Sequence, residues 1–180
     1  MSHFWKFVGG WDDVIGFISS IDKALVRGAD KIRHAEVCLD HAREIGIMIT
    51  DKGMYITLSD RASEVVIAYD GTPLITFHTH PDVSCRPSYS DLVTMIKDPP
   101  RVDIIKGTDG YFVSDCTSDD FIEFAATYKA LRGRDKVRYI RGFLRVFLCN
   151  VPSAATKKEM FTRISAKVKN ACTRSYASPT

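Results

Sequence analysis

The sequence predicts an α/β fold, in which a mixed β-sheet is sandwiched by helices and a helical extension follows at the C-terminus. Stretches whose apolar residues alternate, as in half-buried strands, are interspersed with stretches whose apolar residues recur at helical spacing. Their order along the chain is helices, strands, one helix, strands and helices, which favours layers packed around a sheet. At 180 residues, with 45% hydrophobic and 26% charged residues, the chain suits one medium domain with a substantial core and some extension.

Two helices are expected in the N-terminal part. The first runs from residue 11 to about residue 26, because its apolar residues recur at helical spacing and Asp12 and Asp13 lie near its start, where acidic side chains favour a helix. Gly28 is expected to break this helix. A second helix is predicted over residues 29–42, with its apolar residues on or near one side.

Strands follow, since the period of the apolar residues changes after the second helix. Residues 45–49 and 54–58 alternate on either side of a turn at 51–53 and predict a β-hairpin. Residues 65–69 and 74–78 predict a second pair of strands. The later part of the chain predicts, in order, a helix over 88–97, a hairpin of strands 102–105 and 111–114, and helices over 118–131, 135–148 and 154–171.

The stretch His78-Thr79-His80-Pro81, followed by Ser88 and Asp91, points to a metal site. Residues two apart in a strand face the same side, so the imidazoles of His78 and His80 can lie side by side. Pro81 ends the strand because it has no N–H to donate, and the pattern Ser-x-x-Asp begins a helix that carries Asp91 as a third ligand. Two histidines and one carboxylate are a typical protein set for one catalytic Zn²⁺, with the fourth position left to water.

The same residues also have structural interpretations. Ser88 and Asp91 are equally typical of a helix start, with an N-cap and an acid at the third position, and the two histidines could be ordinary strand residues. Cys85 lies between the histidines and Ser88, where it is either near the metal or a bystander in the loop. The five cysteines are scattered without CxxC pairs, which argues against a disulfide framework and against a cysteine zinc site.

With these residues in place, the sequence resembles the JAMM/MPN⁺ metalloproteases, whose motif is a glutamate, then H-x-H-P, about six residues, and S-x-x-D. Residues 41–49 resemble the segment that carries the family's glutamate, which makes Glu44 the candidate and leaves Glu36 and Glu64 as alternatives. The resemblance covers roughly residues 29–132. It implies the JAMM/MPN fold, a cytidine-deaminase-like mixed sheet between helices, with residues 1–132 as the metalloprotease domain and 133–180 as a basic helical extension.

The resemblance implies a catalytic set as well. Glu44 would be the general base that takes a proton from the attacking water and later protonates the leaving amine. Ser88 would donate to the oxyanion, and His78, His80 and Asp91 would hold the zinc. The implied substrates are amide or isopeptide bonds in conjugates of ubiquitin-like or small sulfur-carrier proteins. Short connections on both sides of the motif favour a compact prokaryotic or viral type of member.

Two other functions fit these residues. The chain could be a non-catalytic MPN-type scaffold or binding module in a larger assembly, although such scaffolds usually lack the metal ligands. It could also be a different zinc hydrolase that acts on a small amide.

Charge is divided unevenly along the chain. Residues 129–180 hold 13 Lys and Arg against 2 acidic residues, whereas residues 1–128 hold 12 against 20, so the two parts carry +11 and −8. In the predicted helix 135–148, Arg138, Arg141 and Arg145 recur at helical spacing. This face is either the solvated side of a core-packing helix or a contact for a polyanion such as nucleic acid, for an acidic protein or for a membrane surface. The sequence has neither a membrane-spanning stretch nor a signal-peptide layout, so a cytoplasmic protein is expected.

Overall fold

The computed structural model describes residues 3–59 and 67–149, and these residues form one α/β unit. The elements, in chain order, are β1 (Trp5–Val8), α1 (Trp11–Ile21), the 3₁₀ helix η1 (Lys23–Leu25), α2 (Val26–Glu36), β2 (Ile45–Thr50), β3 (Met54–Leu58), β4 (Pro73–Thr79), α3 (Tyr89–Lys97), β5 (Val102–Gly107), β6 (Gly110–Asp115), α4 (Asp119–Ala130) and α5 (Arg134–Cys149).

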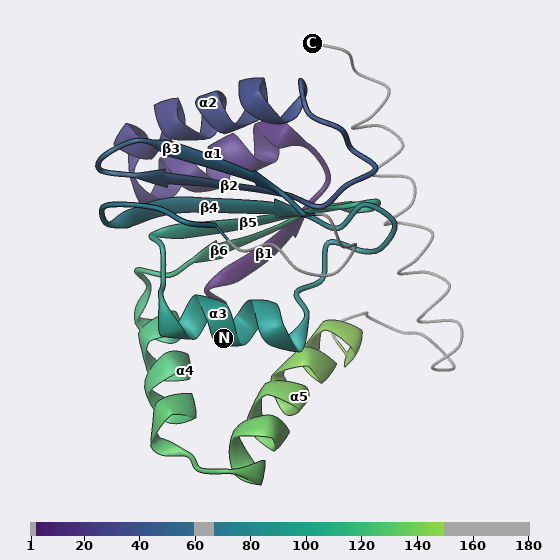
Figure 1. The fold of residues 1–180 in the computed structure, drawn as a ribbon. Coiled ribbons are helices and arrows are strands. Elements are labelled where there is room, and N and C mark those ends of the chain that lie inside the picture. Colours follow the sequence, from purple (N-terminus) through teal and green to yellow (C-terminus); the bar gives the residue numbers. More distant parts are fainter. Residues whose placement is uncertain (1–2, 60–66, 150–180) are drawn as a thin grey trace.

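The strands form one six-stranded sheet in the order β1-β6-β5-β4-β2-β3. β4 and β5 run parallel, and every other neighbouring pair is antiparallel. Figure 1 shows α1 and α2 over one face of the sheet and α3 across the other, with α4 and α5 beyond α3. The predicted α/β class and mixed sheet are therefore confirmed.

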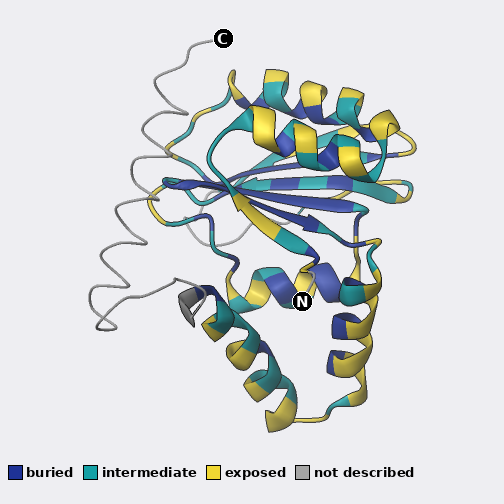
Figure 2. Cartoon of the chain, turned by 180° about the vertical axis from the view of Figure 1, so that it is seen from behind, coloured by how far each residue is buried: buried dark blue, intermediate teal, exposed yellow. Residues whose placement is uncertain are grey.

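Alternation along the strands divides the core between the two faces of the sheet. Ile75 and Phe77 pack in the cluster beneath α1 and α2, whereas Ile105 and Phe112 pack with α3, α4 and α5. Figure 2 shows the central strands as largely buried, as expected for strands covered on both faces. His78 pairs with Ile105 in the parallel register, so its side chain lies on the α3 face.

The second helix differs from the prediction at both ends. α2 begins at Val26 and continues through Gly28, where a Cβ would lie 3.2 Å from Ile75 Cδ1, so glycine lets the helix pack closely on β4. The helix ends at Glu36 instead of residue 42. Beyond it, the Asp40 carboxylate accepts the N–H two residues further on at 3.0 Å, a local bond that favours a turn over a helix.

The predicted strand over residues 65–69 is wrong for residues 67–69, the part of it that the structure describes. Residues 67–69 are not in a strand, and residues 65 and 66 lie outside the described part. Both edges of β4 are already paired, with β2 on one side and β5 on the other, which leaves no position for this segment. Tyr69 instead hydrogen-bonds the Asp98 carboxylate at the end of α3. In addition, β1 is an edge strand that the sequence did not predict.

The first helix is shorter than predicted: α1 ends at Ile21, because Asp22 has an extended backbone and its carboxylate accepts from Ala24 N at the start of η1. The remaining predicted elements within the described residues are present, and α4 and α5 close the α3 face. Ile140 and Phe147 of α5 are buried, and the ring of Phe147 lies 4.7 Å from that of Trp5. The predicted helix 154–171 lies outside the described residues, and the division between residues 1–132 and 133–180 stays a prediction. None of the helices in the described ranges combines the length and the hydropathy that crossing a bilayer requires.

Candidate metal site

Three predicted ligands come together where β4 ends and α3 begins. His78 lies in β4, His80 is the first residue after that strand, and Asp91 lies in the first turn of α3. Their ligand atoms all lie within 4.8 Å of one another. The side chains are 12% to 19% exposed, so the group is sheltered but open to solvent.

The spacing of these atoms suits a tetrahedral ion. His78 Nε2 and His80 Nε2 are 3.2 Å apart, and the Asp91 carboxylate oxygens lie 3.3 Å from His78 Nε2 and 3.2 Å from His80 Nε2. Metal–ligand distances of about 2.0–2.1 Å at tetrahedral angles place neighbouring ligand atoms about 3.3 Å apart. The two imidazole nitrogens thus have the spacing of two vertices around a small tetrahedral cation, and the Asp91 carboxylate presents one oxygen to each of them.

The hydrogen bond made by His80 Nδ1 determines that the other ring nitrogen, Nε2, faces His78 and Asp91. His80 Nδ1 lies 2.8 Å from the carbonyl oxygen of Ser84. A carbonyl only accepts hydrogen bonds, so Nδ1 carries the proton and donates it. In the neutral ring Nε2 then presents a lone pair toward the Asp91 carboxylate, which is also an acceptor. A cation between them would satisfy both groups.

Asp91 also serves the helix, as the structural interpretation of Ser88 and Asp91 predicts. Ser88 Oγ accepts from Asp91 N at 3.0 Å, and Asp91 Oδ2 accepts from Ser88 N at 2.8 Å, which together form a capping box at the start of α3. The cap and the metal-facing role coexist, because the same carboxylate reaches both histidines. Capping thereby fixes the orientation of the third ligand.

The electrostatics of the group favour positive charge at its centre. Burial by itself lowers the pKa of His78, but the hydrogen bond and charge of Asp91 outweigh it and raise that pKa to about 9. Burial by itself raises the pKa of Asp91, but the neighbouring imidazoles of His78 and His80 hold the pKa of that carboxyl far below its usual range. The Asp91 carboxylate therefore favours positive charge on or between the two imidazoles.

Glu44 is the remaining member of the predicted set, and it lies at the start of β2. Gly46 pairs with His78, so Glu44, two residues earlier, lies on the same face as the histidines. It is 7% exposed. Burial raises the pKa of Glu44, and the charges of His78 and His80 partly offset that effect. The Glu44 carboxylate therefore lies on the face of the sheet that carries the histidines, near enough for their charges to affect its pKa.

The backbone around Glu44 is held on both sides. Its carbonyl accepts from Ser59 N at 2.9 Å, and the next N–H, that of Ile45, donates to Thr79 Oγ1 at 2.9 Å. Thr79 lies between the two histidines in sequence. The base candidate and the ligands are thus tied together through one strand pair.

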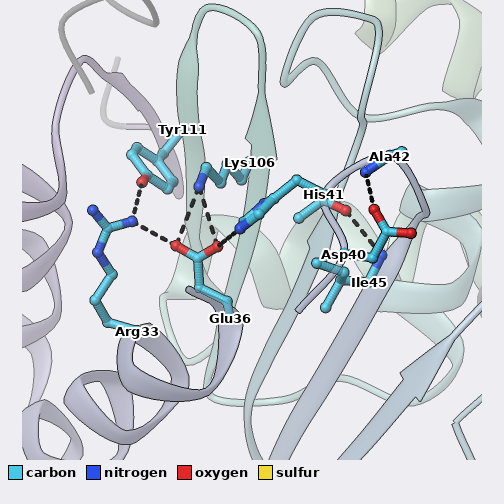
Figure 3. A network of polar contacts seen from close by, with 9 residues as sticks. Arg33, Glu36, Asp40, His41, Ala42, Ile45, Lys106 and Tyr111 are labelled. Atoms are coloured by element: carbon cyan, nitrogen blue, oxygen red, sulfur yellow. Dashed lines mark hydrogen bonds and ion pairs between the residues drawn. The ribbon is translucent and has the colours of Figure 1, made fainter. Parts of the chain in front are cut away.

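Glu36, an alternative to Glu44, points to the opposite face of the sheet. Its carboxylate accepts from Arg33 Nη1 at 2.5 Å and from Lys106 Nζ at 3.1 Å, and it lies 3.6 Å from His41 Nε2. Figure 3 shows the Glu36 carboxylate between Arg33, Lys106 and His41, beside the segment that leads through Asp40 to β2. Glu36 therefore anchors the α2–β2 connection and does not face the candidate metal site. Glu64 lies outside the described residues.

Cys85 is a packing residue. It is 2% exposed within the cluster under α3 and is not among the converging ligand atoms. Burial, followed by the charge of Asp109, raises the pKa of its thiol well above the usual value. The bystander interpretation fits these observations.

One carboxylate near the site was missed from the sequence. Asp103 in β5 pairs with Thr76, whose hydroxyl donates to it at 2.6 Å, and it lies on the same face as His78. Burial raises the pKa of Asp103 to about 6, against the opposing effect of His78. The available signal was a carboxylate within the apolar run of residues 102–105, since a charged residue that is buried in a strand usually has a partner.

No protein-family model matches this chain, and no curated protein or solved structure is significantly similar to it.

Proposed function

We propose that this protein is a zinc-dependent peptidase or isopeptidase of the JAMM/MPN⁺ type. The observation that carries the proposal is the convergence of His78, His80 and Asp91, with the Glu44 carboxylate near enough for the charges of the histidines to affect its pKa. Two imidazoles and one carboxylate form the open ligand set of catalytic zinc, whereas structural zinc sites are usually closed by four protein ligands. The JAMM/MPN fold and one Zn²⁺ per chain belong to the same proposal.

The chain's own groups can carry the proton transfers of amide hydrolysis. Zinc held by His78, His80 and Asp91 would supply Lewis acidity at the site. The Glu44 carboxylate would take a proton from the attacking water and later deliver it to the leaving nitrogen. Its raised pKa suits this double use, because a group with a pKa nearer neutrality both accepts and donates readily.

Ser88 suits the role of oxyanion donor. Its Oγ accepts the N–H of Asp91 in the capping box, and a hydroxyl that accepts one bond still has its own hydrogen to donate. Its place at the first turn of α3 keeps it beside the ligand Asp91. A donor aimed at the developing negative charge stabilises the transition state more than the ground state.

The proposed substrates are conjugates of ubiquitin-like or small sulfur-carrier proteins. This substrate class rests on the family resemblance, and the type of member is suggested by the connection after the site, where only residues 98–101 separate α3 from β5. Added segments that grip two ubiquitins, as in eukaryotic members of the family, have no room in this connection. A compact prokaryotic or viral type of member, acting on one small partner, is the nearest likeness.

Removal of the metal tests the proposal. The purified protein should bind Zn²⁺ at one ion per chain and hydrolyse a ubiquitin-like or sulfur-carrier protein fused to a fluorogenic amine. A chelator should abolish hydrolysis, and added Zn²⁺ should restore it, because all three ligands belong to one ion. Zinc-loaded protein that cleaves no conjugate but hydrolyses a small amide would assign it to a different class of zinc hydrolase.

A binding module is the second candidate, and the exposed face of α5 favours it. Arg134, Arg138, Arg141 and Arg145 are all exposed, and their spacing places them on one side of the helix over about 16 Å. The opposite side of α5 is buried in the core. Arginines aligned in this way match the regular negative charges of a nucleic acid, to which guanidinium groups bind in pairs of hydrogen bonds.

Salt dependence measures this second function. Replacing Arg138, Arg141 and Arg145 by Ala should reduce the slope of log K against log salt for a single-stranded oligonucleotide by about 2, since each lost phosphate contact changes it by roughly 0.7. A control with Lys23, Arg27 and Lys31 replaced by Ala removes the same charge from exposed positions on the α1/α2 side. Equal slopes for the two variants would reject a specific role for α5.

A further inference from the structure

The loop between His80 and α3 is held by the hairpin turn that joins β5 to β6. Asp109 lies in this turn and is 4% exposed. Its Oδ1 accepts from Cys85 N at 2.6 Å, and its Oδ2 accepts from Ser84 Oγ at 2.5 Å. One buried carboxylate therefore fixes two consecutive residues of the loop.

Backbone contacts bring the same two segments together. His80 N donates to Lys106 O at 2.7 Å, and Thr108 N donates to Val83 O at 2.9 Å. A Cβ at Gly107 would lie 2.0 Å from Cys85 N, so the loop rests directly on the backbone of the turn. The position of the loop is determined by the hairpin and leaves no space for a side chain between them.

These contacts lead to a metal ligand. The carbonyl of Ser84 accepts from His80 Nδ1 at 2.8 Å, and Asp109 binds the hydroxyl of that same serine. The bond at Nδ1 places the proton on that nitrogen and turns Nε2 toward His78 and Asp91. Asp109 thus reaches His80 through a single intervening residue.

We propose that Asp109 is a positioning residue for the metal site, which fixes the ring orientation and tautomer of His80 by holding Ser84 and Cys85. The role rests on the proposed metal site and is independent of which bond the enzyme cleaves. Groups that orient a metal-bound histidine typically change metal affinity by about 10–100-fold when they are removed. An ordinary loop-stabilising carboxylate would change stability and leave the affinity of the folded protein unchanged.

The zinc affinity of variants tests this role. Asp109→Ala should raise the zinc Kd by about 10–100-fold, whereas Asp109→Asn, which keeps an acceptor for Cys85 N and the same shape, should recover much of the affinity. Val113→Ala is the control for stability, because Val113 is fully buried on the α1/α2 face. It should unfold more easily but bind zinc as the wild type does. A folded Asp109→Ala with the wild-type Kd would overturn the proposal.

A measurement on the metal-free protein separates this proposal from the proposed function. Nitrogen-15 NMR of the His80 ring should show one tautomer with the proton on Nδ1 in the wild type and a mixture in Asp109→Ala. Ser84→Ala is the second variant, for use if Asp109→Ala does not fold. It keeps the carbonyl that accepts from His80 but loses the hydroxyl held by Asp109, so its His80 ring should show a smaller change toward a mixture of tautomers. If the wild-type protein binds no zinc, the proposed metal site is wrong, but the effect of Asp109 on the His80 ring can still be measured. If the His80 tautomer is unchanged in both variants, the proposed role of Asp109 is overturned.

Discussion

Glu44→Gln is expected to lower kcat for conjugate hydrolysis by about 10²–10⁴-fold while zinc stays bound at the wild-type stoichiometry. A positioned general acid–base group contributes an effect of this size. Glutamine has nearly the same shape, so the buried position of Glu44 at the start of β2 should accept it without repacking. The loss should appear in kcat, because the carboxylate moves protons and is not a metal ligand in the proposed site.

Single-turnover hydrolysis and metal analysis of the same preparation measure the two quantities together. Glu123→Gln makes the same chemical change at an exposed position of α4 and should leave both unchanged. If Glu44→Gln cleaves as fast as the wild type while holding zinc, the base has been assigned to the wrong residue.

Asp91→Ala is expected to lose stoichiometric zinc and all metal-dependent hydrolysis, whereas Ser88→Ala should keep the metal. Both residues form the capping box of α3, so each substitution should cost about 1 kcal/mol of folding free energy through the cap. Only Asp91 faces the two histidines. Comparing the two variants therefore separates capping from metal binding. Both should lose folding free energy, but only Asp91→Ala should lose zinc.

Ser88→Ala should nevertheless lose about 10²–10³-fold in kcat, which is the usual effect of removing one oxyanion donor. Urea unfolding, zinc titration and kcat measured on both variants complete the comparison. Equal zinc affinities for the two variants would remove Asp91 from the ligand set. A Ser88→Ala enzyme with wild-type kcat would leave that serine with capping alone.

Local patterns predicted most of the elements because their signals are contained in a few residues. The hairpin of β2 and β3, the start of α3 at its cap and the hairpin of β5 and β6 all follow from alternation or from turn and cap chemistry. The end of α2 was misplaced, since it depends on the burial of Glu36 against Lys106 of a distant strand. The strand predicted over 65–69 is absent at residues 67–69, and local sequence could not show this, because it does not reveal that both edges of β4 are paired with β2 and β5.

The candidate site shows the same division. His78, His80 and Asp91 lie in one strand-loop-helix segment, so spacing alone could place them together. Glu44 required the family resemblance, because the register of β2 against β4 brings it to the site. Asp109 falls between the two strands of the predicted hairpin, and nothing in its sequence neighbourhood indicates that its carboxylate binds residues 84 and 85 of a distant loop.

The single parallel strand pair has a consequence for the order in which the site is built during folding. The segment between β4 and β5 contains α3, and its ligand contact from His80 to Asp91 spans only 11 residues. The bond that fixes the chain beside Glu44, from Ile45 to Thr79, spans 34. Short-range contacts close at a lower entropic cost and earlier than long-range ones. In the proposed enzyme, the metal ligands would therefore be able to converge before the sheet brings Glu44 beside them.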